Sequence, residues 1–396
     1  MSVITCIEDL RELYLKRVPR MFVDYCESGS WTETTLHRNL EDFARIQLHQ
    51  RVAVGVDKCS QRSTLLGEDV ALPVALAPVG LCGMQHADGE MLAARAALDF
   101  GVPFTISTMS VCSIEEVAEF VQRPFWFQLY VMRDHDFIGS LIDRAKVAGC
   151  SALMLTLDLQ VMGQRHRDIK NGLSTPPKPT LRNLANLARH PRWCWHMART
   201  HRRQFGNIVG HVAGVSDMSS LAAWTAEQFD RSLNWNDVDW IRDRWGGKLI
   251  LKGIMNPEDA ELAVARGADA IVVSNHGGRQ LDGAPSSISV LPAIAARVGD
   301  RCEVWLDSGV RSGQDVFKAL ALGARGVLIG RAYIYGLGAL GETGVRTALE
   351  LIRRELDLTM VLCGVRSIED IDACVIEGLH ALPGSETVRR PRHEPL

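Results

Sequence analysis

The chain has 396 residues, of which 46% are hydrophobic and 23% are charged, with a formal net charge of −3. This balance is typical of a globular protein and gives no reason to expect a nucleic-acid partner. The N-terminus shows no basic segment followed by an apolar one, and no uninterrupted apolar run approaches membrane-spanning length. Ten scattered Cys residues without a Cys-x-x-Cys pair favour reduced thiols, and we expect a cytoplasmic protein.

The start of the chain predicts a helical lead-in. Leu10, Leu13 and Leu15 belong to a helical stretch that precedes Pro19, and proline cannot continue a helix because it lacks the amide hydrogen. We assign residues 1–70 to this lead-in.

Eight short apolar segments after the lead-in predict strands, and several of them follow a helix end and a glycine, as at Gly101 and Gly267. The intervening segments mostly suit helices. Alternating strands and helices indicate a parallel sheet with helical crossovers. Eight repeats favour an α/β fold of the (βα)8 TIM barrel type, and an open doubly wound sheet is the alternative. The predicted strands are 74–76, 104–106, 125–127, 152–155, 249–251, 270–273, 304–306 and 327–329.

Polar or glycine-containing segments directly follow these strands. In a barrel the carboxyl ends of the strands meet at one face, where catalytic groups gather. The segment after the sixth strand, Ser274 to Arg279, combines a base, a planar cation and two glycines that let the backbone approach a ligand. A glycine-rich loop with a structural His276 is the alternative interpretation.

A long insertion separates the fourth and fifth strands, at about 164–236. Between Ile169 and Ser216 it holds eight Lys or Arg residues and no Asp or Glu, with Trp193 and Trp195 among them. Cations mixed with aromatic residues suit an anionic membrane surface. A lid over the site or an oligomer contact are the alternatives. We therefore expect a single domain over 1–396, with the barrel at 71–365, the insertion within it and a tail at 366–396.

With these motifs the chain resembles the FMN-dependent 2-hydroxy-acid dehydrogenases and oxidases, such as flavin-type lactate dehydrogenases, glycolate oxidase and mandelate dehydrogenase. The similarity runs from Asp9 to about Arg366, and the stretch 274–282 is similar to the family's signature. Segments 70–84, 104–116 and 126–132 look closest to bacterial respiratory L-lactate dehydrogenases. Membrane-associated members also carry the long loop, and members often form tetramers, so the resemblance implies a homo-oligomer.

The resemblance implies roles for the side chains that would bind and oxidise a 2-hydroxy acid. His276 matches the base that accepts a proton, and Asp158 matches the carboxylate that would stabilise the resulting imidazolium. Arg279 matches the clamp on the substrate carboxylate, because its planar fork can bind two oxygens. The other matching substrate contacts are Tyr25, Tyr130 and Arg165.

The resemblance also implies FMN as cofactor. Lys252 matches the lysine beside flavin N1 and O2, where a cation would stabilise the anionic reduced ring. The residues that match the family's flavin-ring contacts are the backbone of Ala77, Pro78 and Val79 and the side chains of Ser107, Gln128, Thr156 and Ser274. Those that match the ribityl contact and the phosphate cradle are Asp307, Gly309, Arg311, Gly330 and Arg331.

A second glycine motif points elsewhere. The segment 336–341 fits the Gly-x-Gly-x-x-Gly fingerprint of dinucleotide-binding folds, but it does not directly follow a strand and no further βα unit completes a nucleotide-binding half. We therefore expect a helix packed on the barrel here, and no dependence on NAD.

Two pocket residues indicate which electron acceptor and which substrate to expect. Gly80 stands where several oxidases of the family carry Ala, and the flexible Met109 replaces an aromatic residue of glycolate-type enzymes. We predict oxidation of L-lactate to pyruvate, with electrons passed to a quinone or cytochrome by a protein at the cytoplasmic face of the inner membrane. The alternatives are a mandelate-like substrate, an oxidase that forms hydrogen peroxide, and a flavin-binding protein without turnover. Hydride transfer and a carbanion route stay open.

Overall fold

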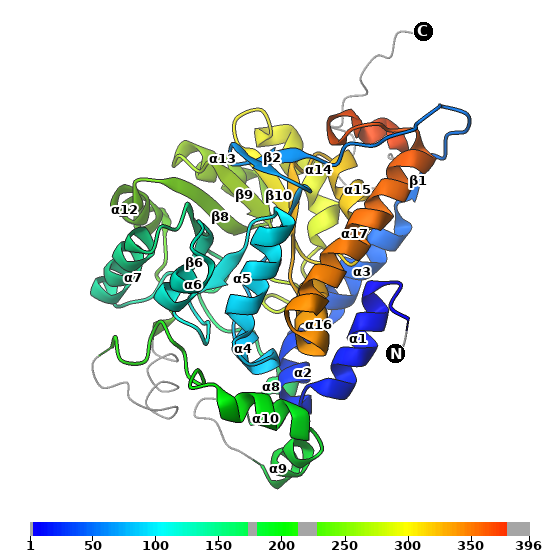
Figure 1. Ribbon diagram of the computed structural model, residues 1–396. Helices are drawn as coiled ribbons and strands as arrows, with labels where there is room; N and C mark the ends of the chain where they lie inside the picture. The colour runs from blue at the N-terminus through cyan, green and yellow to red at the C-terminus, as the bar shows by residue number, and fades with distance from the viewer. Residues whose placement is uncertain (1–2, 173–179, 213–227, 378–396) are drawn as a thin grey trace.

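The computed structural model describes residues 3–172, 180–212 and 228–377, and its centre is a parallel sheet of eight strands (Figure 1). Strands that follow one another along the chain are neighbours in the sheet. A parallel bridge between Leu76 and Phe104, with Leu76 N donating to Pro103 O at 2.9 Å, joins the first strand to the second and closes the barrel. The strands are β4 (Val74–Leu76), β5 (Thr105–Ser107), β6 (Trp126–Tyr130), β7 (Ala152–Thr156), β8 (Lys248–Ile254), β9 (Ala270–Val273), β10 (Glu303–Leu306) and β11 (Gly326–Ile329).

The predicted (βα)8 barrel is confirmed, with strand ends that differ from expectation by a few residues. Inward-facing side chains fill the barrel, and the rings of Trp126 and Trp305 stack there with centroids 5.2 Å apart. A hairpin of β2 (Ser63–Leu65) and β3 (Glu68–Val70) adds Leu65 and Val70 to this inner cluster. The barrel is therefore a packed core, and ligands can approach only at its ends.

Helices surround the barrel and bury the outer faces of its strands (Figure 1). Most of these helices come after a barrel strand in the chain, as expected for βα units. They are α4 (Cys82–Gln85), α5 (Gly89–Phe100), α6 (Ile114–Val121), α7 (His135–Val147), α12 (Trp235–Trp245), α13 (Pro257–Ala265), α14 (Ser287–Val298), α15 (Gly313–Ala321), α16 (Arg331–Leu340) and α17 (Glu342–Cys363).

The second glycine motif lies in α16, as predicted, and its glycines serve helix packing. A Cβ atom on Gly336 would lie 2.2 Å from the Gly344 carbonyl oxygen of α17, and one on Gly338 would lie 2.4 Å from the Tyr14 ring. Only glycine allows these backbones to approach so closely. The motif therefore reflects helix contacts in this protein.

The first part of the lead-in forms helices, as predicted: α1 (Ile7–Arg17), α2 (Arg20–Glu27) and α3 (Thr34–Arg45). Pro19 separates the first two with an extended backbone. The second part of the lead-in, 46–70, was wrongly predicted as helical, because it contains the short strands β1 (Gln47–Leu48), β2 and β3 instead. The strand β1 pairs with β12 (Ile376–Glu377), close to the short helices η1 (Ile368–Asp370) and η2 (Ala373–Val375). The division into a single domain with the predicted boundaries stays a prediction.

The described part of the insertion contains α8 (His166–Lys170), α9 (Leu181–Ala188) and α10 (Pro191–Arg199). These helices lie beside α2 at the end of the molecule opposite the β2–β3 hairpin (Figure 1). Among the described residues, no helix combines the length and apolar character needed to cross a bilayer.

Candidate active site

The expected base and its carboxylate partner meet at the carboxyl ends of two strands. His276 follows β9 and Asp158 follows β7, and the His276 Nδ1 lies 2.8 Å from Asp158 Oδ1. His276 has a φ of +58°, and Gly277 and Gly278 continue this left-handed conformation. A Cβ on Gly278 would lie 2.5 Å from the Leu36 amide nitrogen, so glycine is required there. The carboxylate occupies Nδ1, and Nε2 is therefore the nitrogen that can accept a proton.

The charges of this pair suit a base at neutral pH. Burial lowers the pKa of His276, although the Asp158 carboxylate raises it in part. Burial alone raises the pKa of Asp158, but the neighbouring His276 and Lys252 charges outweigh it, so its pKa lies below the ordinary value. Asp158 Oδ2 is buried without a hydrogen-bond partner among the described residues, 3.9 Å from Lys252 Nζ. A neutral imidazole thus faces an ionised carboxylate.

Lys252, at the end of β8, lies between two carboxylates. Its Nζ donates to Ser274 Oγ at 3.0 Å and lies 3.5 Å from Asp307 Oδ2. The side chain is 5% exposed. Burial lowers the pKa of Lys252, but the Asp307 and Asp158 charges raise it above its ordinary value. The site therefore holds a permanent buried cation beside the base.

A row of buried polar side chains crosses three neighbouring strand ends. Ser107 Oγ donates to Gln128 Oε1 at 3.0 Å, and Gln128 Nε2 donates to Thr156 Oγ1 at 3.0 Å. Ala77, Pro78 and Val79 follow β4 on the other side of the barrel closure. Such a row offers donors and acceptors to the polar edge of a planar ring.

Two arginines bring positive charge to the same mouth of the barrel. Arg279 Nη1 donates to the carbonyl oxygens of Tyr25 at 2.5 Å and Ser28 at 3.0 Å. Arg165 is buried, its Nε has no partner among the described residues, and its Nη1 lies 3.5 Å from Asp168 Oδ2. Burial, and then the Arg279 charge, lower the pKa of Arg165. An anionic ligand such as a carboxylate would relieve this repulsion.

Two tyrosines from different parts of the chain complete the mouth. Tyr25 comes from α2, and its ring lies 4.9 Å from the Arg279 guanidinium carbon. The Tyr130 ring, at the end of β6, lies 6.5 Å from the His276 ring. Burial raises the pKa of both phenols, so each keeps its proton and can donate a hydrogen bond.

Arg311, after β10, and Arg331, after β11, form a third cationic group. Arg331 donates to the carbonyl oxygens of Cys26 at 2.8 Å and Gly277 at 2.9 Å. Burial, the Arg311 charge and the Arg279 charge lower the pKa of Arg331 to about 10. Among the described residues no carboxylate forms an ion pair with Arg311 or Arg331. The pair has the charge to hold a phosphate.

Gly309 and Gly330 lie in the same region, but packing requires glycine at only one of these positions. Gly309 has a φ of +103°, and a Cβ there would lie 2.4 Å from Asn39 O of α3. A Cβ on Gly330 would meet only Val79 Cγ2 at 3.8 Å and Ala77 Cβ at 3.9 Å. Packing therefore requires glycine at 309, whereas the space at 330 is open to a ligand.

Sequence reasoning missed two residues that hold this site together. Gln280 Nε2 donates to the carbonyl oxygens of Asp158 at 2.7 Å and Val161 at 2.8 Å, which ties the segment after β7 to the loop after β9. Asp168 accepts from Ser28 Oγ at 3.3 Å and faces Arg165. The spacing of three residues between Arg165, which precedes α8, and Asp168 in its first turn was the signal for the second.

Known proteins share both the sequence and the fold. Residues 15–377 match the FMN-dependent dehydrogenase family. The L-lactate dehydrogenase of Caulobacter vibrioides strain NA1000 is 48% identical over 375 residues, which cover 94% of this chain and 98% of that protein. The L-lactate dehydrogenase of Caulobacter sp. strain K31 is 47% identical over 94% of this chain and 98% of its own length.

Solved structures agree. The crystal structure of the monotopic membrane protein (S)-mandelate dehydrogenase matches with a TM-score of 0.90 and 37% identity, over 95% of this chain and 100% of that one. A mandelate oxidase structure matches with a TM-score of 0.78 and 37% identity, over 93% and 96%. The chain therefore belongs to the FMN-dependent dehydrogenase family, and it is a 2-hydroxy-acid dehydrogenase whose cofactor is FMN.

Proposed function

We propose that this enzyme oxidises L-lactate to pyruvate and passes the electrons to a quinone or cytochrome at the membrane. The observation that carries the proposal is the hydrogen-bonded pair of His276 and Asp158 beside two arginines, the buried Arg165 and the half-buried Arg279. The pair provides a base, and the arginines provide a site for the carboxylate of a 2-hydroxy acid. The choice of lactate follows the curated relatives that carry this name.

The residues at the barrel mouth fit FMN. The polar row of Ser107, Gln128 and Thr156 can face the ring, with Lys252 at its N1 and O2 edge and Ser274 beside Lys252. When bound, FMN supplies a two-electron acceptor. Lys252 would then stabilise negative charge on the ring.

The other end of the cofactor site is suited to the ribityl chain and the phosphate. Arg311 and Arg331 would hold the phosphate, Gly330 would leave room for its oxygens, the backbone at Gly309 would line the cradle, and Asp307 would contact the ribityl chain. The low pKa of Arg331 supports this assignment, because a buried cation near two others favours an anion.

The substrate is held by its carboxylate. Arg279 and Arg165 bind the two oxygens, and the protonated Tyr25 adds a hydrogen bond from α2. Tyr130 donates to the oxygen on C2, and this orients the substrate so that C2 faces the cofactor. Arg165 is buried, and Tyr25, Tyr130 and Arg279 are half-buried, which limits the access of water to the substrate.

Proton removal falls to His276. Its Nε2 accepts a proton from the substrate, and the ionised Asp158 stabilises the imidazolium formed. The proton comes from the hydroxyl in a hydride route and from C2 in a carbanion route, and the geometry of His276 serves both.

An oxidase that transfers electrons to oxygen is the second candidate, favoured by the structural match to mandelate oxidase. Gly80 favours the dehydrogenase, because several oxidases of the family carry Ala at this position. In this structure a Cβ at residue 80 would lie 3.0 Å from Tyr25 Oη and 3.2 Å from Met109 O. The test is to add L-lactate to the purified holoenzyme in air and to follow flavin absorbance and peroxide together. Lasting loss of absorbance with little peroxide is expected. Stoichiometric peroxide would make the enzyme an oxidase, and loss of absorbance only with mandelate would change the substrate.

We further propose peripheral attachment to the cytoplasmic face of the inner membrane through the insertion. Leu181 and Leu184 of α9 are 85% and 55% exposed, and Trp195 of α10 is 62% exposed. Arg182 and Arg199 lie on the same helices. Exposed apolar side chains flanked by cations suit an anionic bilayer, and the similar (S)-mandelate dehydrogenase is described as monotopic. Sedimentation of the holoenzyme would test the expected homo-oligomer.

A further inference from the structure

A pocket of about 270 Å³ lies on the flank of the barrel, away from the residues assigned to catalysis. It is formed where α10 meets the body of the molecule. The end of α1, the turn after α4, the end of α16 and the first turn of α10 line it. Its walls therefore come from four parts of the chain that are distant in sequence.

Positive charge dominates this flank pocket. Lys16 and Arg17 line it from α1, and Arg189 and Arg192 line it from the start of the α10 segment. No Asp or Glu belongs to its lining, and among the described residues no carboxylate forms an ion pair with any of these four side chains. Lys16, Arg189 and Arg192 are exposed, so solvent screens their mutual repulsion, and together with Arg17 they give the hollow a positive potential that attracts an anion.

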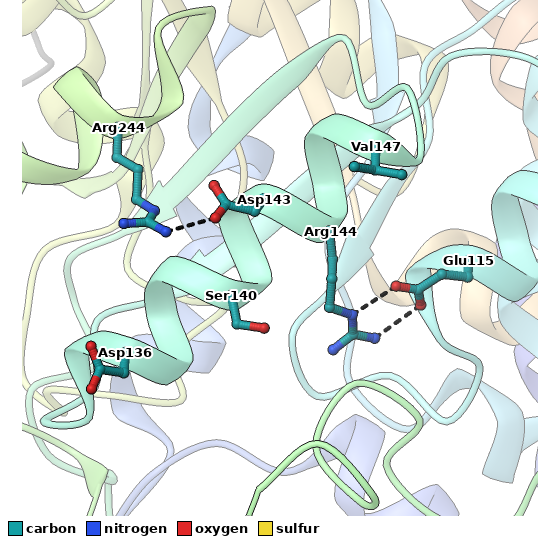
Figure 2. A pocket seen from close by; sticks show the side chains of 7 residues that line it. All are labelled: Glu115, Asp136, Ser140, Asp143, Arg144, Val147 and Arg244. Atoms are coloured by element: carbon teal, nitrogen blue, oxygen red, sulfur yellow. Dashed lines mark hydrogen bonds and ion pairs between the residues drawn. The ribbon is translucent and has the colours of Figure 1, made fainter.

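A second hollow shows the usual arrangement (Figure 2). It lies over α6, α7 and α12, and its cations are paired: Arg144 Nε lies 2.7 Å from Glu115 Oε1, and Arg244 Nη2 lies 2.6 Å from Asp143 Oδ2. The charges of that hollow neutralise one another, so they create no demand for a ligand. The flank pocket lacks this internal neutralisation.

Three imidazoles add to the flank pocket: His86, His190 and His196. The rings of His86 and His196 lie 5.4 Å apart. Burial, and then the nearby His196 and Arg192 charges, lower the pKa of His86. Burial and the Arg192 charge likewise lower the pKa of Arg17. Cationic groups thus destabilise one another here, and a bound anion would reverse that effect.

The walls of the pocket are fixed to the barrel. The Trp193 ring stacks on Phe22 at a centroid distance of 5.3 Å, and Trp193 Nε1 donates to Met84 O at 3.0 Å. Arg17 Nη1 donates to Ala339 O of α16. The first turn of α10, where backbone amides carry partial positive charge, also lines the pocket. Trp193 and Arg17 therefore fix the walls of the pocket, from which the exposed side chains of Arg189 and Arg192 can reach a ligand.

We propose that the flank pocket binds a phosphate group, carried by a phospholipid headgroup or by a soluble phosphate compound. Phosphate fits because its several oxygens and charge of more than one can engage cations on different walls, whereas a carboxylate presents only two oxygens. The site is separate from the FMN phosphate cradle, which follows β10 and β11. The proposal does not rest on the proposed oxidation of lactate.

The test titrates inorganic phosphate into FMN-loaded, full-length protein by calorimetry. Arg189→Gln with Arg192→Gln removes two cations of the pocket, and both side chains are exposed. Lys58→Gln with Arg62→Gln removes the same charge from exposed positions just before β2, outside both the pocket and the insertion. The pocket variant is expected to bind phosphate at least about tenfold more weakly than the wild type, and the control to stay within about twofold.

Flavin content, melting temperature and lactate turnover of both variants should stay unchanged, which verifies folding. Equal phosphate affinity in the pocket variant and the control, or no binding to the wild-type protein, would overturn the proposal.

Vesicle flotation distinguishes the two sources of the phosphate group. Vesicles of phosphatidylcholine with phosphatidylglycerol are compared with phosphatidylcholine alone. Selective loss of flotation in the pocket variant, relative to the control, supports a lipid headgroup as the ligand. Equal flotation of both variants, with phosphate affinity lost only in the pocket variant, supports a soluble phosphate compound.

Discussion

Charges at the barrel mouth and charges on the insertion are organised in opposite ways. At the mouth, Lys252 is buried, the side chains of Asp158 and His276 are only 12% and 18% exposed, and Asp158 contacts both of the others at strand ends that the barrel holds rigid. On the insertion, Arg189 and Arg192 are exposed and lie beside other cations. Buried paired charges keep fixed positions, as proton transfer requires, whereas exposed unpaired charges attract ligands or surfaces from solution.

This contrast predicts that the two regions can be damaged independently. Variants at the mouth should lose turnover and keep vesicle binding, and variants on the insertion should do the reverse. A soluble dye as electron acceptor allows turnover to be measured without a membrane.

The largest effect is expected for His276→Gln. Glutamine cannot accept the substrate proton, so kcat should fall about 10²–10⁴-fold. FMN content and vesicle flotation should match those of the wild type, because His276 is not among the side chains that would hold the cofactor. Turnover within a few-fold of the wild type would remove His276 from the role of base.

The next effect is expected for Arg279→Gln. Loss of the planar cation removes charge-assisted hydrogen bonds to the substrate carboxylate, and kcat/KM should fall about 10²–10³-fold. Lys170→Gln is a matched control, because Lys170 is an exposed cation at the end of α8. Steady-state kinetics with L-lactate would measure both, and equal losses in the two variants would contradict a specific clamp.

A smaller effect is expected for Asp158→Asn, with a shift in the pH profile. Because neutral His276 is the active form, kcat/KM should rise with pH and level off above the pKa of His276, which burial holds below its ordinary value. The Asp158 carboxylate raises that pKa in part, so its loss should move the inflection to lower pH and reduce the plateau about tenfold to 10²-fold. An inflection that moves to higher pH would contradict the pairing.

The smallest effect concerns the insertion. Leu181→Ser with Leu184→Ser removes exposed apolar surface from α9, and flotation with anionic vesicles should fall about tenfold. Turnover with the soluble dye should not change. Leu262→Ser on α13 is the control, since Leu262 is also exposed but lies outside the insertion. Unchanged flotation of the α9 variant would remove this surface from membrane attachment.

Much of the fold followed from the sequence because its signals are local. Each strand of the barrel is a short apolar run before a polar segment, and strand ends of a barrel share one face, so contacts such as that between His276 and Asp158 could be expected from residues 118 positions apart. The Gly336 motif was also correctly assigned to a helix, because no strand directly precedes it.

Other features depend on contacts that no local pattern encodes. The flank pocket combines Arg17 with Arg192 only after α1 and α10 pack together. The role of Gln280 arises from carbonyl oxygens of a distant loop. The roles of individual residues in catalysis and cofactor binding stay predictions, and the variants above test them.

The most direct test of the central claim is anaerobic reduction of the holoenzyme in a rapid-mixing experiment. The purified protein is mixed with L-lactate, with L-lactate deuterated at C2, or with D-lactate, and flavin absorbance is followed. We expect rapid loss of absorbance with L-lactate, a slower loss with the deuterated substrate because its C2 bond to hydrogen is broken, and none with D-lactate. A holoenzyme that keeps its flavin absorbance with L-lactate would contradict the account.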